Sequence, residues 1–287
     1  MTNPLLETWE TPFGLPPFDR IEDAHFAPAI EAAMVEGLAE VELIAINPEP
    51  PTFENTIEGL MRTGASLDRV LGVFYNLAGA DSTDAREEIM REFSPKLAAH
   101  SAAIYGNQAL FSRIEQVWLA RDALDLTPEQ ARVLMLTHRG FVRAGAALMG
   151  GDAARMKEIK GRLATLGTQF GQNLLADERD WQRALSEDEL EGLPGFVINA
   201  VRAAGKERGA GGPVLTLSRS VIVPFLQFCP NRALREEAWR AWVARGESGG
   251  KTDNRDVAAE ILGLRHERAQ LLGYDDFASY KLETEMA

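Results

Sequence analysis

The sequence predicts a mostly α-helical protein with one small β element near residues 213–228. Apolar residues recur at three- and four-residue spacing along most of the 287 residues, which is typical of helices with one buried face. One short segment breaks this period, because it is rich in alternating β-branched residues and follows a run of glycines. We therefore expect stacked helices and one or two short strands.

Three apolar stripes predict long helices. The helix of the first stripe is expected to end before Asn47-Pro48, and the helix of the second before Gly79. The stripes consist of Ile30, Met34, Leu38 and Val41; of Ile57, Leu60, Leu67, Leu71, Phe74 and Leu77; and of Met156, Ile159, Leu163, Leu166, Phe170, Leu174 and Trp181. We interpret these side chains as core residues and not as cofactor contacts.

Capping signals predict where several helices begin. Thr127 can cap a helix that has Pro128 at its first position, and residues 186–189 (Ser-Glu-Asp-Glu) form a second capping box. Either Asp253 or Asn254 is expected to cap a helix that runs to Gly273. Asp275-Asp276 predicts one more helix start, shortly before the last residue.

The β element is expected within residues 213–223. Pro224 confines any strand there to the edge or the end of a sheet. The preceding Gly209-Ala210-Gly211-Gly212 lacks the Lys-Ser/Thr of a phosphate-binding loop and opens a strand, not a helix. We interpret it as a flexible turn.

Composition excludes several classes of function. The formal net charge of −13 argues against a nucleic-acid partner, which requires a basic face. No apolar stretch approaches the roughly 20 residues of a membrane helix, and the first residues do not resemble a secretory signal. We expect a cytoplasmic protein with no membrane partner. We expect residues 1–287 to form one helical region, which could be divided into two subdomains, 1–185 and 186–287.

Cys229 is the only cysteine, so an internal disulfide and a thiolate pair for a metal are both excluded. It follows the apolar run Phe225-Leu226-Gln227-Phe228, which favours a buried structural cysteine over a reactive one.

One segment comes close to a zinc-peptidase motif. His266-Glu267-Arg268-Ala269-Gln270 has the His-Glu pair of H-E-x-x-H, but Gln270 stands where the second histidine is needed. Two imidazoles one helical turn apart bind the metal, and the intervening Glu serves as the general base. We interpret His266 and Glu267 as surface residues of an amphipathic helix.

The remaining polar candidates point to ordinary structural roles. The other histidines, His25, His100 and His138, lie on separate predicted helices without a second histidine at ligand spacing. His25 lies near Glu22 and Asp23, which we interpret as a helix start. The adjacent carboxylates Glu87-Glu88 and Glu236-Glu237 would point about 100° apart on a helix, so neither pair forms a catalytic dyad.

Several segments, in order and over nearly the whole chain, resemble the thimet oligopeptidase family of zinc peptidases, most closely its bacterial peptidyl-dipeptidase (dipeptidyl carboxypeptidase) and oligopeptidase A branch. They are PFDRI at 17–21, HFAPAI at 25–30, PTFENT at 51–56, LGTQFGQN at 166–173, LTLSR at 215–219, TDNR at 252–255, LLGY at 271–274 and YKL at 280–282. The resemblance implies the amino-terminal half of a longer, two-lobed helical enzyme, whose H-E-x-x-H helix and third ligand lie beyond residue 287.

The resemblance also implies a function. The intact protein would hydrolyse oligopeptides with zinc as cofactor and release carboxy-terminal dipeptides, while this chain would form part of the channel wall and be inactive alone. Its partners would be the catalytic half of the same polypeptide and the peptide substrate. No catalytic, metal-binding or substrate-binding residue is assigned to this chain. Two alternatives stay open: a stand-alone helical interaction module, and an enzyme with an unrecognised site.

Overall fold

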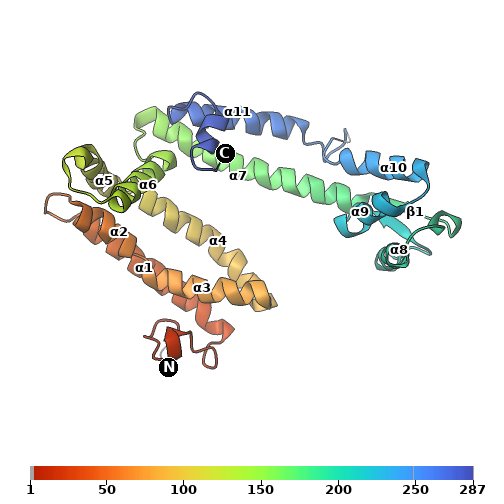
Figure 1. Cartoon of the computed structure of the whole chain (residues 1–287), viewed down its shortest axis with the longest axis horizontal. Helices are drawn as coiled ribbons and strands as arrows, with labels where there is room; N and C mark the ends of the chain where they lie inside the picture. The colour runs from red at the N-terminus through yellow and green to blue at the C-terminus, as the bar shows by residue number, and fades with distance from the viewer. Residues whose placement is uncertain (1–2, 248, 287) are drawn as a thin grey trace. The chain divides into compact units, whose positions relative to one another are not determined.

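The computed structural model describes residues 3–247 and 249–286, and it is mostly α-helical, as predicted (Figure 1). The chain divides into two compact units, Met1–Ala153 and Ala154–Ala287. The possible subdomain boundary between residues 185 and 186 stays a prediction. No helix in the described part of the chain is both long enough and apolar enough to cross a membrane.

The first unit is built from helices and short helical turns. Its elements are η1 (Pro12–Gly14), η2 (Asp23–His25), α1 (Phe26–Ala45), the π-helical turn η3 (Phe53–Glu58), α2 (Gly59–Arg62), α3 (Ala65–Ala80), α4 (Asp84–Tyr105), α5 (Gln108–Ala120), η4 (Arg121–Ala123) and α6 (Pro128–Ala144). The long helix α1 packs against α3, α4 and α5, so it takes part in both apolar clusters of this unit.

Those two clusters lie at opposite ends of α1. The first joins α1 to α3 and α4, with Phe26 and Phe74 meeting edge to face at 5.1 Å. The second joins the end of α1 to η3, α5 and α6 around Ile57, Ile114 and Leu134, all fully buried. Burial of such apolar side chains is the main force that stabilises a helical stack.

The second unit contains the longest helix and a small sheet. Its elements are α7 (Gly150–Asp180), β1 (Gln182–Ala184), η5 (Asp188–Leu190), α8 (Gly195–Glu207), β2 (Val214–Thr216), α9 (Arg219–Phe228), α10 (Arg232–Val243), α11 (Arg255–Leu271) and α12 (Phe277–Leu282). The strands pair antiparallel, with Arg183 opposite Leu215. The main apolar cluster lies under this sheet and α8, α9 and α10, around Val201, Ile222 and Phe225.

The first and third stripes form the predicted helices, α1 and α7, whereas the prediction of one helix for the second stripe is wrong. That stripe is divided among η3, α2 and α3, and α3 continues past Gly79 to Ala80. The break falls at Gly64, whose φ of +76° is left-handed and suits glycine. The backbone N–H of Gly64 donates to Glu40 at 2.7 Å, a bond from outside the stripe.

The predicted β element is confirmed at β2 but is shorter than expected. Residues 219–228 form helix α9, so the prediction of strand up to Val223 is wrong. Val221, Ile222 and Phe225 are buried while Val223 is 42% exposed, which is a helical burial pattern and not an alternating one. Contact with the core of the second unit therefore overrides the β propensity of these residues.

The capping signals have different outcomes. Thr127 and Gln130 form the reciprocal capping box at the start of α6, as predicted. The box at Ser186 and Glu189 also forms, but it begins only the three-residue turn η5. Gly192 follows with φ of +80°, which stops a helix there.

At the end of the chain both predicted helices are present. Asn254 is the cap residue of α11, and the Asp253 carboxylate accepts from the backbone N–H of Arg255. Asp276 caps α12 by accepting from Ser279 at 2.7 Å. The glycine run at 209–212 is a turn that leads into β2, as predicted.

Candidate functional site

The segment that comes close to the zinc motif lies on α11. His266 is exposed there, and Glu267 is engaged by a guanidinium. Arg155 donates to the two Glu267 oxygens at 2.6 and 2.9 Å. These hydrogen bonds hold the pKa of Glu267 below its usual range, so the carboxylate stays charged and tied to Arg155. Gln270 is also exposed, and its amide is no substitute for an imidazole ligand.

The other histidines each have a local partner. The His25 ring accepts from the backbone N–H of Glu22 at 3.0 Å, which agrees with its interpretation as part of a helix start. His100 is buried, and its ring lies 3.1 Å from the carbonyl of Met34. His138 lies 2.5 Å from Glu115 and stacks on Trp118 at 4.7 Å.

These four histidines are therefore not brought together. Among residues 3–247 and 249–286, no group of three or more His, Cys, Asp or Glu side chains is arranged to hold a metal ion. Glu236 and Glu237 also turn to different partners: Glu236 accepts from Arg240, and Glu237 from Arg183.

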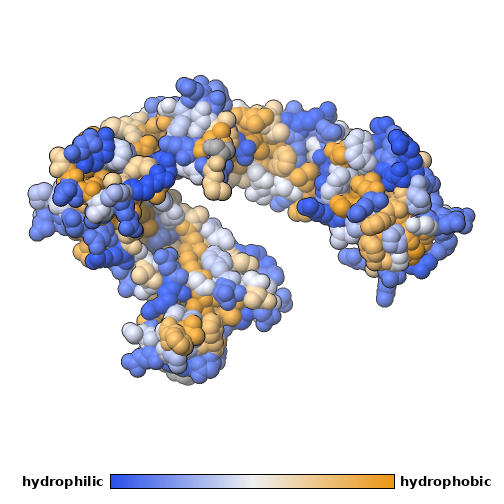
Figure 2. All heavy atoms as spheres, viewed as in Figure 1, coloured by the Kyte–Doolittle hydropathy of each residue, from blue (hydrophilic) through white to orange (hydrophobic). Residues whose placement is uncertain are grey.

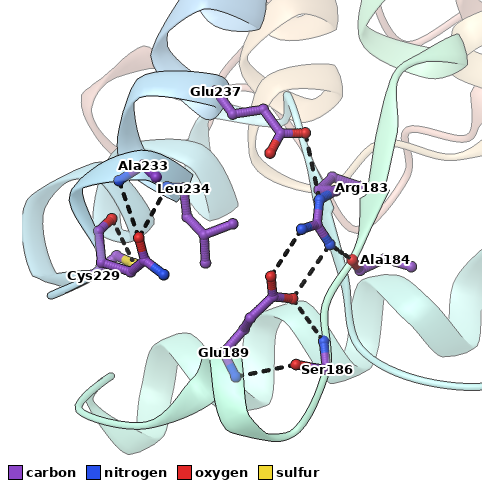
Figure 3. Close-up of polar contacts among 9 residues, drawn as sticks. Arg183, Ala184, Ser186, Glu189, Cys229, Ala233, Leu234 and Glu237 are labelled. Carbon is purple, nitrogen blue, oxygen red and sulfur yellow. Dashed lines mark hydrogen bonds and ion pairs between the residues drawn. The ribbon is translucent and has the colours of Figure 1, made fainter.

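Arg183 lies at the centre of a connected polar group in the second unit (Figure 3). It projects from β1 and donates to Glu189 at 2.8 Å, with Glu237 of α10 at 3.4 Å. Glu189 in turn accepts from the backbone of Ser186 at 2.8 Å, and this bond lowers the pKa of the carboxyl. The group joins β1, η5 and α10, which is a structural role.

Cys229 lies beside this group and is buried, as predicted (Figure 3). Its Sγ contacts the carbonyl of Asn231 at 3.7 Å. Burial raises the pKa of the thiol, so the reactive thiolate is disfavoured at neutral pH. The geometry supports the structural interpretation.

Each unit has a groove that could receive a ligand. In the first unit, a groove of about 540 Å³ lies along α1 and α4. It is almost entirely apolar, and Val35 is 70% exposed beside Met34 and Leu38. Lys96 at its rim is already bound by Glu31 at 2.8 Å and Glu92 at 2.7 Å.

In the second unit, a groove of about 450 Å³ lies between α9 and α10. It combines an apolar floor with cationic groups, and its lining residues are Leu226, Arg232, Arg235, Glu236 and Trp239. The sequence interpretation missed these residues. The signal that could have found them is the spacing of Arg232, Glu236 and Trp239 on one face of α10, opposite the buried Leu234 and Ala238.

The described residues thus form two mostly helical units, each with a groove on its surface. Comparison with known proteins shows which proteins this chain is similar to. Residues 225–287 match the model of Peptidase family M3. The chain is 35% identical to the dipeptidyl carboxypeptidase of Salmonella typhimurium, over the whole chain and 42% of that protein. It is 33% identical to the dipeptidyl carboxypeptidase of Escherichia coli and 32% identical to oligopeptidase A of Escherichia coli, again over 42% of each.

The chain is therefore similar over its whole length to part of each of these peptidases, which confirms the resemblance drawn from the sequence segments. It spans less than half the length of these relatives.

Proposed function

We propose that this chain forms the non-catalytic channel wall of a zinc-dependent oligopeptidase. The intact enzyme would hydrolyse short peptides and release dipeptides from their carboxyl ends. The observation that carries the proposal is the alignment of the whole chain with dipeptidyl carboxypeptidase at 35% identity. The catalytic half of the same polypeptide and the peptide substrate would be its partners.

The segment His266–Gln270 of this chain does not fit a zinc site. Gln270 occupies the position of the second histidine, and Glu267 is held by Arg155. Zinc and its general base would therefore be supplied by the catalytic half, and no step of the reaction is assigned to this chain. Its contribution would be to hold and orient the peptide.

We also propose a cytoplasmic location for the intact enzyme. A relative in Arabidopsis thaliana, 28% identical over the whole chain, is named probable cytosolic oligopeptidase A.

The first test is to read the gene past the codon for Ala287. We expect an H-E-x-x-H motif followed by a downstream Glu. A stop codon directly after Ala287 would reject the proposal and favour the stand-alone interaction module, for which the compact groove between α9 and α10 would be the natural binding surface.

The second test is enzymatic. The intact polypeptide should release carboxy-terminal dipeptides from a short peptide, as followed by mass spectrometry, and a zinc chelator should abolish the release. The 287-residue chain alone should release none. Cleavage by the isolated chain would show instead that it contains a site of its own.

A further inference from the structure

The groove between α9 and α10 has the composition of a peptide-binding site. Leu226 of α9 and Trp239 of α10 provide its apolar floor, and Trp239 remains 52% exposed. Figure 2 shows apolar residues gathered over the part of the second unit that contains α8 and α9. Trp and Arg are enriched at binding hot spots because they combine a large apolar surface with directed hydrogen bonds.

Trp239 is not needed in the core. The opposite face of α10 is the one that packs inward, with Leu234 and Ala238 buried. An indole that is half exposed in a groove offers a ligand a large apolar surface together with an N–H donor, which suits a ligand-binding role.

The two arginines of the groove are differently held. Arg235 donates through Nη1 to the carbonyls of Cys229 and Pro230 at 2.5 and 3.0 Å, which fixes its guanidinium in place. Arg232 has no carboxylate partner within residues 3–247 and 249–286. A guanidinium has five N–H donors, so both side chains keep donors for a ligand.

Glu236 also lines the groove, but its charge is neutralised from within α10. Arg240 donates to Glu236 Oε1 through Nε at 3.1 Å and Nη2 at 2.8 Å. The groove is therefore locally cationic on a chain whose net charge is −13. Local charge of this sign attracts a carboxylate.

We propose that this groove binds an acidic segment of the peptide substrate, in which a carboxylate lies next to a large apolar side chain. The carboxylate is held by Arg232 and Arg235, and the apolar side chain lies against Trp239 and Leu226. This inference rests on the proposed function, because it takes the peptide substrate as the ligand, and it adds a substrate-holding surface within this chain.

The groove along α1 and α4 does not support a comparable assignment. Its one cation, Lys96, is neutralised by Glu31 and Glu92, so no charge selects a ligand there.

Fluorescence polarisation with the whole 287-residue chain tests the inference directly. The probe is a short fluorescein-labelled peptide with Asp-Phe at its centre, and the comparison peptide has Asn-Phe. We expect the Asp-Phe peptide to bind about tenfold more tightly, because charge-assisted hydrogen bonds to Arg232 are lost with Asn. Added salt should weaken the binding of the Asp-Phe peptide.

Two variants locate the site. Arg232→Gln and Trp239→Ala should each weaken binding about tenfold. Arg202→Gln is the matched control. Arg202 is an exposed arginine on α8, outside the groove, and its substitution removes the same charge as Arg232→Gln. All three residues are exposed, and circular dichroism should show that each variant folds. Equal affinity for the two peptides, or affinity unchanged by Arg232→Gln and Trp239→Ala, would overturn the inference.

Cleavage by the intact polypeptide separates this inference from the proposed function. If the intact polypeptide releases dipeptides in a chelator-sensitive way but no peptide binds specifically to the groove, the inference about the groove is rejected and the proposed function is retained. Binding that depends on Arg232 and Trp239, without any cleavage by the intact polypeptide, would reject the proposed function and retain the groove as a peptide-binding site.

Discussion

Arg113 holds a turn to a helix through a buried guanidinium. It projects from α5 and donates to the carbonyls of Asn47 and Glu49 at 2.7 and 2.9 Å, and to the Asn55 side chain at 3.1 Å. The residue is only 6% exposed. These hydrogen bonds give donors to the carbonyls of the segment between α1 and η3. α1 and η3 themselves pack around the same apolar cluster as α5.

Arg113→Ala should destabilise the chain by about 3 kcal/mol, because it leaves several inward-facing acceptors without a donor. Arg113→Lys should restore only part of this loss, since a single ammonium group cannot reach the same acceptors as a planar fork. Urea unfolding followed by circular dichroism measures both. The exposed Arg202→Ala is the control, with an expected change within about 0.5 kcal/mol. A similar small change for Arg113→Ala would contradict the structural role.

At the same scale, a short motif can be assessed from the sequence more readily than a buried charged residue. Gln270 alone was sufficient to show that α11 lacks the second zinc ligand. Arg113 gave no such signal, because its partners lie more than fifty residues away along the chain. Only the folded chain brings them together.

The spacing of apolar residues predicts a helix well where that helix packs against its neighbours with one face. α1 ends and α6 begins close to the predicted positions, and α7 contains the third stripe except Trp181. The second stripe and the β segment were predicted less well, since Gly64 takes a left-handed backbone conformation and α9 turns its β-branched residues into the core. Local propensity is a weak preference that tertiary contacts override.

Glycine positions in the helices provide a test at this scale. A Cβ on Gly205 of α8 would lie 2.0 Å from the carbonyl oxygen of Gly212, a backbone atom that cannot move aside easily. Gly161 of α7 has nothing within 4 Å of the same point. Gly205→Ala should therefore destabilise the chain by about 2 kcal/mol, and Gly161→Ala should stabilise it by about 0.5 kcal/mol.

Thermal and urea unfolding of the two variants measure these changes in the free energy of unfolding, which are expected to have opposite signs. Both substitutions add the same methyl group within a helix of the second unit, so intrinsic helix propensity cancels in the comparison. Equal shifts for the two variants would show that the approach of α8 to the glycine turn before β2 is not close.

For the whole molecule, ion pairs on a strongly acidic chain make stability dependent on pH. Asp253 has its pKa lowered to about 2, chiefly by hydrogen bonds from Arg255. The pKa values of Glu260 and Glu267 are also lowered, by Arg162 and Arg155. Glu260 is exposed, and Asp253 and Glu267 are half-buried, so solvent and salt still reduce the contribution of these groups.

We expect the free energy of unfolding to fall as the pH is lowered from about 5 towards 2. Carboxylates with a lowered pKa in the folded state are still ionised when their unfolded counterparts, near pH 4, begin to bind protons. Protons therefore favour the unfolded chain, and stability that is present above about pH 5 is lost. Urea unfolding at a series of pH values measures this, and Asp253→Asn should flatten the lower part of the curve. The same stability at pH 3 and pH 6 would contradict it.

The sequence by itself determined the helical class, the main apolar stripes, the buried state of Cys229 and the similarity to oligopeptidases. These properties depend on residue type and short-range spacing, which can be read along the chain. Only the tertiary structure decided the helical state of residues 219–228, the ion pair of Glu267 and the groove of Arg232 and Trp239. Each of these depends on surfaces from different elements meeting in space, and spacing within one element does not specify such contacts.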